Sequence, residues 1–240
     1  MTELLYELRS HVATFTLNRP EARNALNNAL AAALHAACRR AVAEDARLVL
    51  VRANGPVFCA GADVKERAGM EEDAIRARRI RAFAAYDALE HLPMPTVAVV
   101  HGPAIGSGAE IAACCDFVVA TPAAQFRTPE AVRGTVGATQ RLPRAIGKRL
   151  AKDLMFTGRA MGAEEARSIG FVTRLVAPEA LEDELTGIIK AVTGAPSGAL
   201  RLAKRCVDEG VEMHPRGALA NEILAIEENL FSGDWKAAMR

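Results

Sequence analysis

The chain has 240 residues, of which half are apolar and a quarter are charged. These globular proportions exclude an intrinsically disordered or fibrous protein. Lys and Arg together number 30 against 29 Asp and Glu, and aromatic residues make up only 5%. A nucleic-acid-binding protein carries a basic excess or aromatic stacking residues, so we expect no nucleic-acid partner.

The cysteines and histidines show no pattern of a disulfide scaffold or a metal site. The chain has five cysteines, an odd number, and five histidines without metal-ligand spacing. The N-terminal residues lack the basic and apolar regions of a signal peptide, and no apolar run approaches the roughly 18 residues of a membrane span. We therefore expect a cytoplasmic protein with reduced thiols, no metal, no redox cofactor and no membrane partner.

The first half of the chain alternates strand and helix patterns. Apolar alternation or continuous apolar runs predict strands over 4–9, 12–17, 48–51, 96–100 and 117–120, with a tight turn near Ser10. Apolar residues three and four positions apart predict helices over 26–43, 71–91 and 109–114. In the second helix, we expect Ile75, Ile80, Phe83 and Leu89 to face inward. Strands alternating with helices predict an α/β core.

Only helical patterns follow from about Leu142. They are expected over 142–156, 163–169, 179–193, 197–209 and 216–231. We therefore expect two regions, an α/β core over 1–178 and a helical region over 179–240, with no flexible linker between them. The last helices carry apolar residues that their own core does not need, namely Leu200, Leu202, Val207, Leu219, Ile223, Leu224, Ile226 and Leu230. This excess predicts a subunit interface.

Two glycine-containing turns each follow a strand pattern and precede a helical one. The turn over 102–108 suits backbone N–H groups that face an anion or an oxyanion, although tight strand–helix packing explains such glycines equally well. It lacks the third glycine of a dinucleotide fingerprint, and Ser107 is not in a nucleophile elbow because Ile105 replaces its first glycine. The second turn spans 59–63. Two such turns can direct two donors at one oxygen.

Two glutamates lie next to these turns. Glu110 is in the first turn of an apolar helix, where a carboxylate either interacts with the helix dipole or acts as a catalytic group with a raised pKa. Glu130 follows Pro129 in a loop, and by itself is most simply a solvent-facing residue. The basic residues Arg76, Arg78, Arg79 and Arg81 are interpreted as a solvated helix face, with contact to a phosphate group as the alternative.

Seven short motifs occur in order along the chain. They are 18–26 (NRPEARNAL), 58–66 (FCAGADVKE), 101–110 (HGPAIGSGAE), 115–116 (CD), 125–130 (QFRTPE), 139–144 (TQRLPR) and 156–158 (FTG). These motifs and their order resemble the crotonase (enoyl-CoA hydratase/isomerase) superfamily, and the resemblance covers about 18–177. It implies a spiral of stacked ββα units in the core over 1–178. It also implies that the helical region over 179–240 builds a homotrimer or a dimer of trimers.

The resemblance implies acyl-CoA thioester substrates and assigns roles to individual residues. The backbone N–H groups of Ala62 and Ser107 would form an oxyanion hole that polarises the thioester carbonyl and holds the enolate. The residues implied to bind substrate or CoA are Ala25, Leu26, Ala60, Ala62, Asp63, Val64, Lys65, Gly106 and Ser107. An enolate needs fixed donors in a site shielded from water, which agrees with these assignments.

The two glutamates indicate the reaction. Enoyl-CoA hydratases of the superfamily use a pair 20 positions apart, as Glu110 and Glu130 are here. By position, Glu110 matches the glutamate that orients water and Glu130 the proton donor, and hydration requires both an acid and a base. We therefore expect an enoyl-CoA hydratase with no cofactor beyond the CoA of its substrate. The alternatives are an enoyl-CoA isomerase with Glu130 as its only base, and a catalytically silent CoA-thioester-binding protein.

The chain departs from the superfamily pattern at two places. Ser107 stands where the superfamily usually has glycine, and the loop over 134–139 is about three residues shorter. The residues missing from that loop help to position water. The shortening is therefore expected to lower hydration more than it lowers thioester binding.

Overall fold

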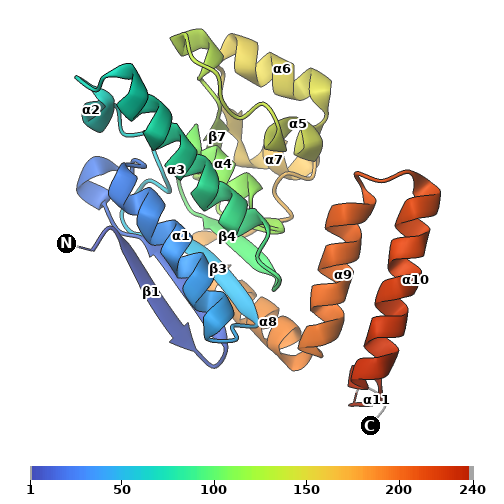
Figure 1. Cartoon of the computed structure of the whole chain (residues 1–240). Coiled ribbons are helices and arrows are strands. Elements are labelled where there is room, and N and C mark those ends of the chain that lie inside the picture. Colours follow the sequence, from blue (N-terminus) through green and yellow to red (C-terminus); the bar gives the residue numbers. More distant parts are fainter. Residues whose placement is uncertain (1, 238–240) are drawn as a thin grey trace.

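The computed structural model describes residues 2–237 (Figure 1). Its strands are β1 (Leu4–Arg9), β2 (Val12–Leu17), β3 (Leu48–Ala53), β4 (Thr96–Val100), β5 (Pro103–Ile105), β6 (Phe117–Ala120), β7 (Gln125–Arg127), β8 (Met161–Gly162) and β9 (Arg174–Leu175). Its α-helices are α1 (Asn28–Ala43), α2 (Val64–Arg67), α3 (Glu72–Glu90), α4 (Ser107–Ala113), α5 (Arg141–Ile146), α6 (Lys148–Thr157), α7 (Ala163–Ser168), α8 (Leu181–Gly194), α9 (Ser197–Gly210), α10 (Pro215–Ser232) and α11 (Asp234–Ala237). Short 3-10 helices lie at Pro20–Ala22, Ala131–Arg133 and Pro178–Ala180.

The main sheet has the strand order β1-β2-β3-β4-β6-β9. β1 pairs antiparallel with β2 through a tight turn in which Ser10 and His11 have positive φ, so the turn expected near Ser10 is confirmed. The other neighbouring strands pair in parallel. Parallel pairing requires crossover segments, which the helices supply.

A smaller sheet, β5-β7-β8, runs beside the main one. β5 pairs in parallel with β7, and Cys59 adds a parallel bridge to Ala104 of β5. Each of β3, β4 and β6 thus leads from the main sheet into a segment of the smaller sheet and then into a helical segment. This repeated path confirms the spiral of ββα units.

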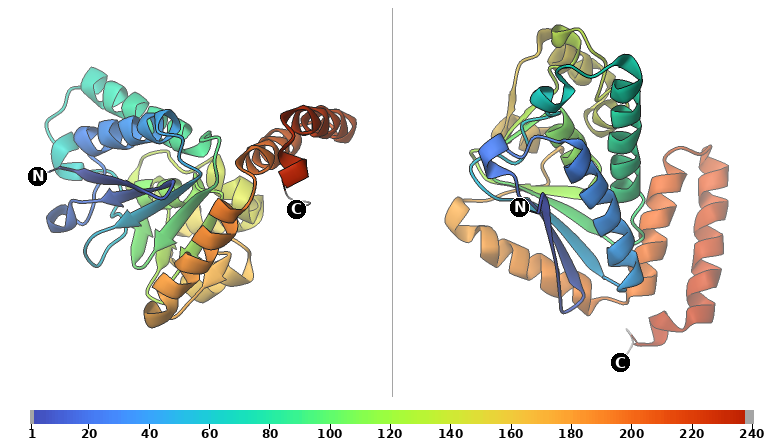
Figure 2. Two further views of the ribbon diagram at one scale, coloured as in Figure 1. Left: turned by 90° about the horizontal axis from the view of Figure 1, so that it is seen from below. Right: turned by 60° about the vertical axis from the view of Figure 1, so that its left-hand side comes forward.

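The central strands are buried on both faces, as their continuous apolar sequences predict. In β3, Val49 and Val51 belong to the hydrophobic cluster under α1, whereas Leu48 and Leu50 belong to a second cluster with side chains of α8. Figure 2 shows α1 and α3 on one side of the sheet and α8 on the other. Helices therefore cover both faces of the sheet.

The last helices form a hairpin that extends away from the sheet. In Figures 1 and 2, α9 and α10 lie side by side and project from the core, while α8 packs against it. Large apolar side chains remain exposed on this hairpin, including Val207, Val211, Leu219, Ile223, Leu224, Ile226, Leu230 and Phe231. The expected division at residues 178 and 179 stays a prediction. No helix in residues 2–237 has the length and apolar character to cross a membrane.

Three expectations about elements were wrong. Ile80 and Phe83 of α3 do not face inward; they are 69% and 53% exposed, because Ala85, Tyr86 and Leu89 form the buried face of this helix. The helix expected over 142–156 is two helices, since Gly147 has φ +81° and interrupts it. The second half also contains β8 and β9, which are too short to show a periodic pattern.

Candidate active site

The two glycine-containing turns lie side by side, as expected. The Cys59 N–H donates to Pro103 O at 3.2 Å, and the Ile105 N–H donates to Cys59 O at 2.9 Å. Gly61 has φ +101°, and a Cβ there would lie 3.1 Å from the carbonyl oxygen of Ile105. Glycine is therefore required for this close approach of the two backbones.

Each turn presents one unpaired backbone N–H group. The Leu26 N–H donates to Gly61 O at 2.8 Å, and the Asp63 N–H donates to Leu26 O at 2.9 Å. In an extended segment successive N–H groups point to opposite sides, so the Ala62 N–H points away from Leu26. Within residues 2–237, the N–H groups of Ala62 and Ser107 donate no hydrogen bond. Two donors on adjacent turns are thus available to a ligand.

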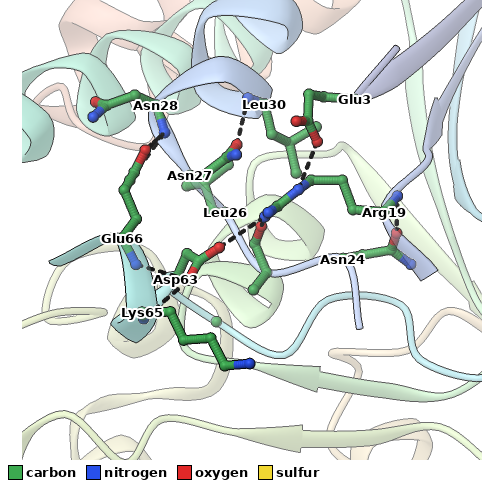
Figure 3. A network of polar contacts seen from close by, with 12 residues as sticks. Glu3, Arg19, Asn24, Leu26, Asn27, Asn28, Leu30, Asp63, Lys65 and Glu66 are labelled. Carbon is green, nitrogen blue, oxygen red and sulfur yellow. Dashed lines mark hydrogen bonds and ion pairs between the residues drawn. The ribbon is translucent and has the colours of Figure 1, made fainter. Parts of the chain in front are cut away.

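Buried charges hold the turn that contains Ala62 (Figure 3). The Asp63 carboxylate caps α2 by accepting from the Lys65 and Glu66 N–H groups at 3.0 and 3.1 Å. Arg19 donates from Nη1 to Asp63 Oδ2 at 3.0 Å and also to the Ala25 carbonyl. Burial raises the pKa of Asp63, but the Glu66 N–H and the Arg19 guanidinium outweigh it and hold the pKa below its usual value.

Glu66 extends this network to α1. Both its carboxylate oxygens accept from the Asn28 N–H at the start of α1, and Arg78 Nε donates to Glu66 Oε2 at 2.8 Å. Arg78 also donates to the Leu26 carbonyl. The expectation that Arg78 belongs to a solvated face is therefore wrong, since its side chain is only 7% exposed. We call Arg19, Asp63, Glu66 and Arg78 the loop-anchoring network.

The other predicted binding residues differ in exposure. Ala62, Val64 and Lys65 are exposed, and Ala25 and Ala60 are half-buried. In Figure 3 the Lys65 side chain leaves the network, and its ammonium group makes no ion pair within residues 2–237. Leu26 is buried, so its backbone holds the turn while its side chain packs in the core.

Glu110 lies in the first turn of α4 and is buried, as expected. Its Oε2 accepts from Arg141 Nη1 at 3.2 Å, and Arg141 also contacts Glu90. Burial raises the pKa of Glu110; Arg141 opposes the rise, while the nearby carboxylates of Glu130 and Glu90 add to it. Glu110 therefore combines a buried carboxyl with one fixed cation.

Glu130 is half-buried rather than solvent-facing, so the expectation drawn from its loop position alone was wrong. A Cβ on Gly106 would lie 2.6 Å from Glu130 Oε1, and a Cβ on Gly137 would lie 2.9 Å from its Cγ. Its Oε2 is buried without a hydrogen-bond partner within residues 2–237. Burial is the main cause that raises the pKa of Glu130. The carboxyl thus lies against the turn that leads into Ser107.

Sequence reasoning assigned no role to two residues beside Glu110. Arg141 lies in a quoted motif, yet nothing local indicates which carboxylate it contacts. Tyr86 is buried in α3; burial raises the pKa of its hydroxyl, and a hydrogen bond with Ser107 opposes the rise. Tyr86 and Glu90 are four residues apart, so they share one face of α3. This spacing is visible in the sequence and could have pointed to Tyr86. No group of three or more His, Cys, Asp or Glu side chains suited to a metal ion occurs in the described part of the chain.

Comparisons with known proteins identify the family. The family model described as enoyl-CoA hydratase/isomerase matches residues 7–236. A protein of Rhizobium meliloti named probable enoyl-CoA hydratase is 38% identical, over 88% of this chain and 82% of its own length. The human protein named enoyl-CoA hydratase domain-containing protein 2, mitochondrial, is 34% identical, over 93% of this chain and 80% of its own length.

Solved structures show the same fold. The crystal structure of an enoyl-CoA hydratase from Mycobacterium smegmatis is similar with a TM-score of 0.92 and 33% identity, covering 96% of this chain and 91% of that one. That of an enoyl-CoA hydratase from Bacillus anthracis has a TM-score of 0.90 and 33% identity, covering 94% and 90%. Motifs, fold and matched length together show that this chain belongs to the enoyl-CoA hydratase/isomerase family and is an enzyme of the crotonase superfamily.

Proposed function

We propose that this enzyme is an enoyl-CoA hydratase, which adds water across the 2,3 double bond of a 2-enoyl-CoA thioester. One observation carries the proposal: the buried Glu110 and the half-buried Glu130, whose Oε2 is buried, lie at the turn that presents the free Ser107 N–H, and the free Ala62 N–H lies on the adjoining turn. Hydration needs a base for water and an acid for Cα, and both must act on a substrate whose carbonyl is polarised. No further cofactor is needed, because the CoA is part of the substrate.

The N–H groups of Ala62 and Ser107 would hold the thioester oxygen. As water adds to Cβ, negative charge develops on this oxygen, and fixed donors stabilise the enolate more than the ground state. The loop-anchoring network supports the Ala62 donor, since Asp63 and Leu26 fix the peptides on either side of it. Ser107 replaces glycine without loss of the donor because its N–H remains unpaired.

The two carboxyls would divide the proton transfers. Glu110, ionised beside Arg141, accepts a proton from the water whose oxygen bonds to Cβ. Glu130, with its buried and unpartnered Oε2, is the protonated acid that donates to Cα. The enolate then collapses to the 3-hydroxyacyl thioester, and the proton gained by Glu110 returns to Glu130 through solvent. A cation contacts Glu110 and none contacts Glu130 within residues 2–237, and such a difference between two carboxyls is the usual basis of this division.

The exposed end of the loop over 60–65 would bind the CoA portion. Val64 and Lys65 face solvent, and the unpaired ammonium of Lys65 is available to an anionic group of the nucleotide. The half-buried Ala25 and Ala60 and the buried Gly106 would border the path of the pantetheine chain.

Incubation with crotonyl-CoA, followed at the enoyl absorbance, tests the proposal. We expect the conjugated absorbance to fall as water adds and 3-hydroxybutyryl-CoA to appear by mass spectrometry. Retained CoA-thioester binding without turnover would support a catalytically silent protein instead.

An enoyl-CoA isomerase is the second candidate, favoured by one observation. Glu110 Oε2 is held by Arg141, which leaves Glu130 as the less restrained carboxyl. A 3-enoyl-CoA substrate separates the two functions, because an isomerase would create conjugated absorbance from it. Glu110→Gln would abolish hydration but leave isomerisation by Glu130 nearly intact.

We also propose that the enzyme is a homotrimer or a dimer of trimers. Several of the exposed apolar side chains on α9 and α10 line a groove of about 740 Å³, and a contiguous exposed apolar surface of this kind marks an interaction site. Light scattering at micromolar concentration tests this proposal, and a monomeric mass would contradict it.

A further inference from the structure

The guanidinium of Arg141, at the start of α5, lies between carboxylates of two other helices. Its Nε donates to Glu90 Oε2 at 2.8 Å, and its Nη1 donates to Glu110 Oε2 at 3.2 Å. The guanidinium carbon also lies 5.7 Å from the centroid of the Tyr86 ring, one helical turn before Glu90. The Arg141 side chain is only 15% exposed. Tyr86 and Glu90 on α3 thus hold this cation against one oxygen of Glu110.

This contact leaves the other oxygen of Glu110 free. Oε1 accepts no hydrogen bond within residues 2–237, so the Arg141 contact fixes the plane of the carboxylate and leaves Oε1 for a ligand or a water. Glu130 has no comparable cation, and its Oε2 lacks a hydrogen-bond partner. Arg141 therefore distinguishes two glutamates that otherwise share a buried site.

We propose that Arg141 is a positioning residue, held by Glu90 and Tyr86, that favours the carboxylate form of Glu110 and directs its Oε1 at the reacting water. The inference rests on the proposed hydratase function. Burial disfavours the charged form of Glu110, and a cation in direct contact opposes that effect. The titratable and charged groups that face Glu110 are Arg141, Glu130, Glu90, Tyr86 and Cys114. Of these, Arg141 is the group that favours the charged carboxylate.

Substitutions of Arg141 test the proposal by their pH dependence. In Arg141→Gln we expect a kcat at least ~10-fold lower, with KM nearly unchanged, because a base group is impaired. The acidic limb of the pH profile should move up by about 1–3 pH units, the usual effect of removing an adjacent guanidinium. Arg141→Lys should recover part of the activity, because lysine restores the positive charge. The recovery should be incomplete, because a single ammonium group cannot contact both carboxylates as the guanidinium does.

Two further variants separate positioning from general stability. Arg144→Gln is the matched control on the same helix. Arg144 is exposed and pairs with Glu212, so we expect the pH profile of kcat to stay unchanged in this variant. Glu90→Gln keeps Arg141 but removes one of its anchors, and we expect a smaller loss of kcat than in Arg141→Gln. Equal profiles for wild type, Arg141→Gln and Arg144→Gln would overturn the role of Arg141.

Infrared difference spectra, taken between each protein and its Glu110→Gln counterpart, follow the protonation of Glu110 without requiring turnover. The protonated carboxyl band of Glu110 should persist to a pH about 1–3 units higher in Arg141→Gln than in the wild-type background. A wild-type enzyme that hydrates no enoyl-CoA would overturn the proposed function, and the infrared titration would still decide whether Arg141 controls the charge. An unmoved titration overturns the inference even if the enzyme is an active hydratase.

Discussion

The two sides of the candidate site are held in different ways. The turn with Ala62 is fixed by the loop-anchoring network, in which buried side chains cap helices and bind carbonyls. The segment over 131–140, which follows Glu130, has an exposed Val136, and its Thr135 is held mainly by Arg79 and by the Glu130 carbonyl. One side is therefore rigid through buried charge, and the other depends on backbone packing. We expect binding and chemistry to respond to different substitutions.

Glu130→Gln should produce the largest separation of chemistry from binding. The amide cannot donate the carboxyl proton to Cα, so kcat should fall at least ~10²-fold, the scale of one acid or base group. Binding of a CoA thioester should stay nearly unchanged, because the loop-anchoring network is not touched. Steady-state kinetics and calorimetric titration with an unreactive thioester measure the two effects. Glu164→Gln, at an exposed position, is the control. Near-normal turnover in Glu130→Gln would remove Glu130 from the mechanism.

Gly137→Ala should disturb Glu130 without adding or removing a charge. A Cβ at this glycine would lie 2.9 Å from Glu130 Cγ, so the side chain must move. We expect kcat to fall about 10-fold, since a displacement of about 1 Å can cost up to ~10²-fold. Gly162→Ala is the matched control, because no heavy atom lies within 4 Å of its added Cβ. Equal kcat values in the two variants would show that Glu130 tolerates the shift.

The same contrast explains what the sequence could predict. Glu110 was placed correctly because its helix has a clear start and apolar neighbours. The local patterns around Glu130 and Arg78 gave the wrong exposure, although the family resemblance assigned Glu130 a role. Gly106 and Gly137 pack against Glu130, and Glu66 and the Leu26 carbonyl hold Arg78, all through contacts between distant segments. Local patterns predict elements, whereas burial of a charged side chain depends on its tertiary partners.

Asp63→Asn should weaken the rigid side of the site. The variant loses the ion pair with Arg19 and weakens the cap of α2, so we expect unfolding to require about 1–2 kcal/mol less free energy near pH 7. The pKa of Asp63 is depressed in the folded state, so its contribution is complete above the unfolded pKa of about 3.9 and is lost as pH falls through the folded value. Urea unfolding from pH 7 to pH 3 measures this effect. The wild-type advantage should shrink toward acid, and a constant difference would contradict the assignment.

Restoring three residues to the loop over 134–139 should have the smallest effect, and it acts only on chemistry. The segment now passes Gly137 against Glu130 and leads directly into Arg141, which contacts Glu110, so its length affects how both carboxyls face a bound water. A Pro- and Gly-containing insertion after Val136 adds free backbone donors near this water, while the N–H groups of Ala62 and Ser107 stay in place. We expect kcat for crotonyl-CoA to rise several-fold, less than the ~10²-fold that full repositioning can give, with little change in thioester affinity.

A three-residue insertion without glycine at the same point is the control, because it adds length but not the same backbone freedom. If both insertions leave kcat unaltered, the short loop already positions water well; if affinity changes instead, the two sides of the site are not independent.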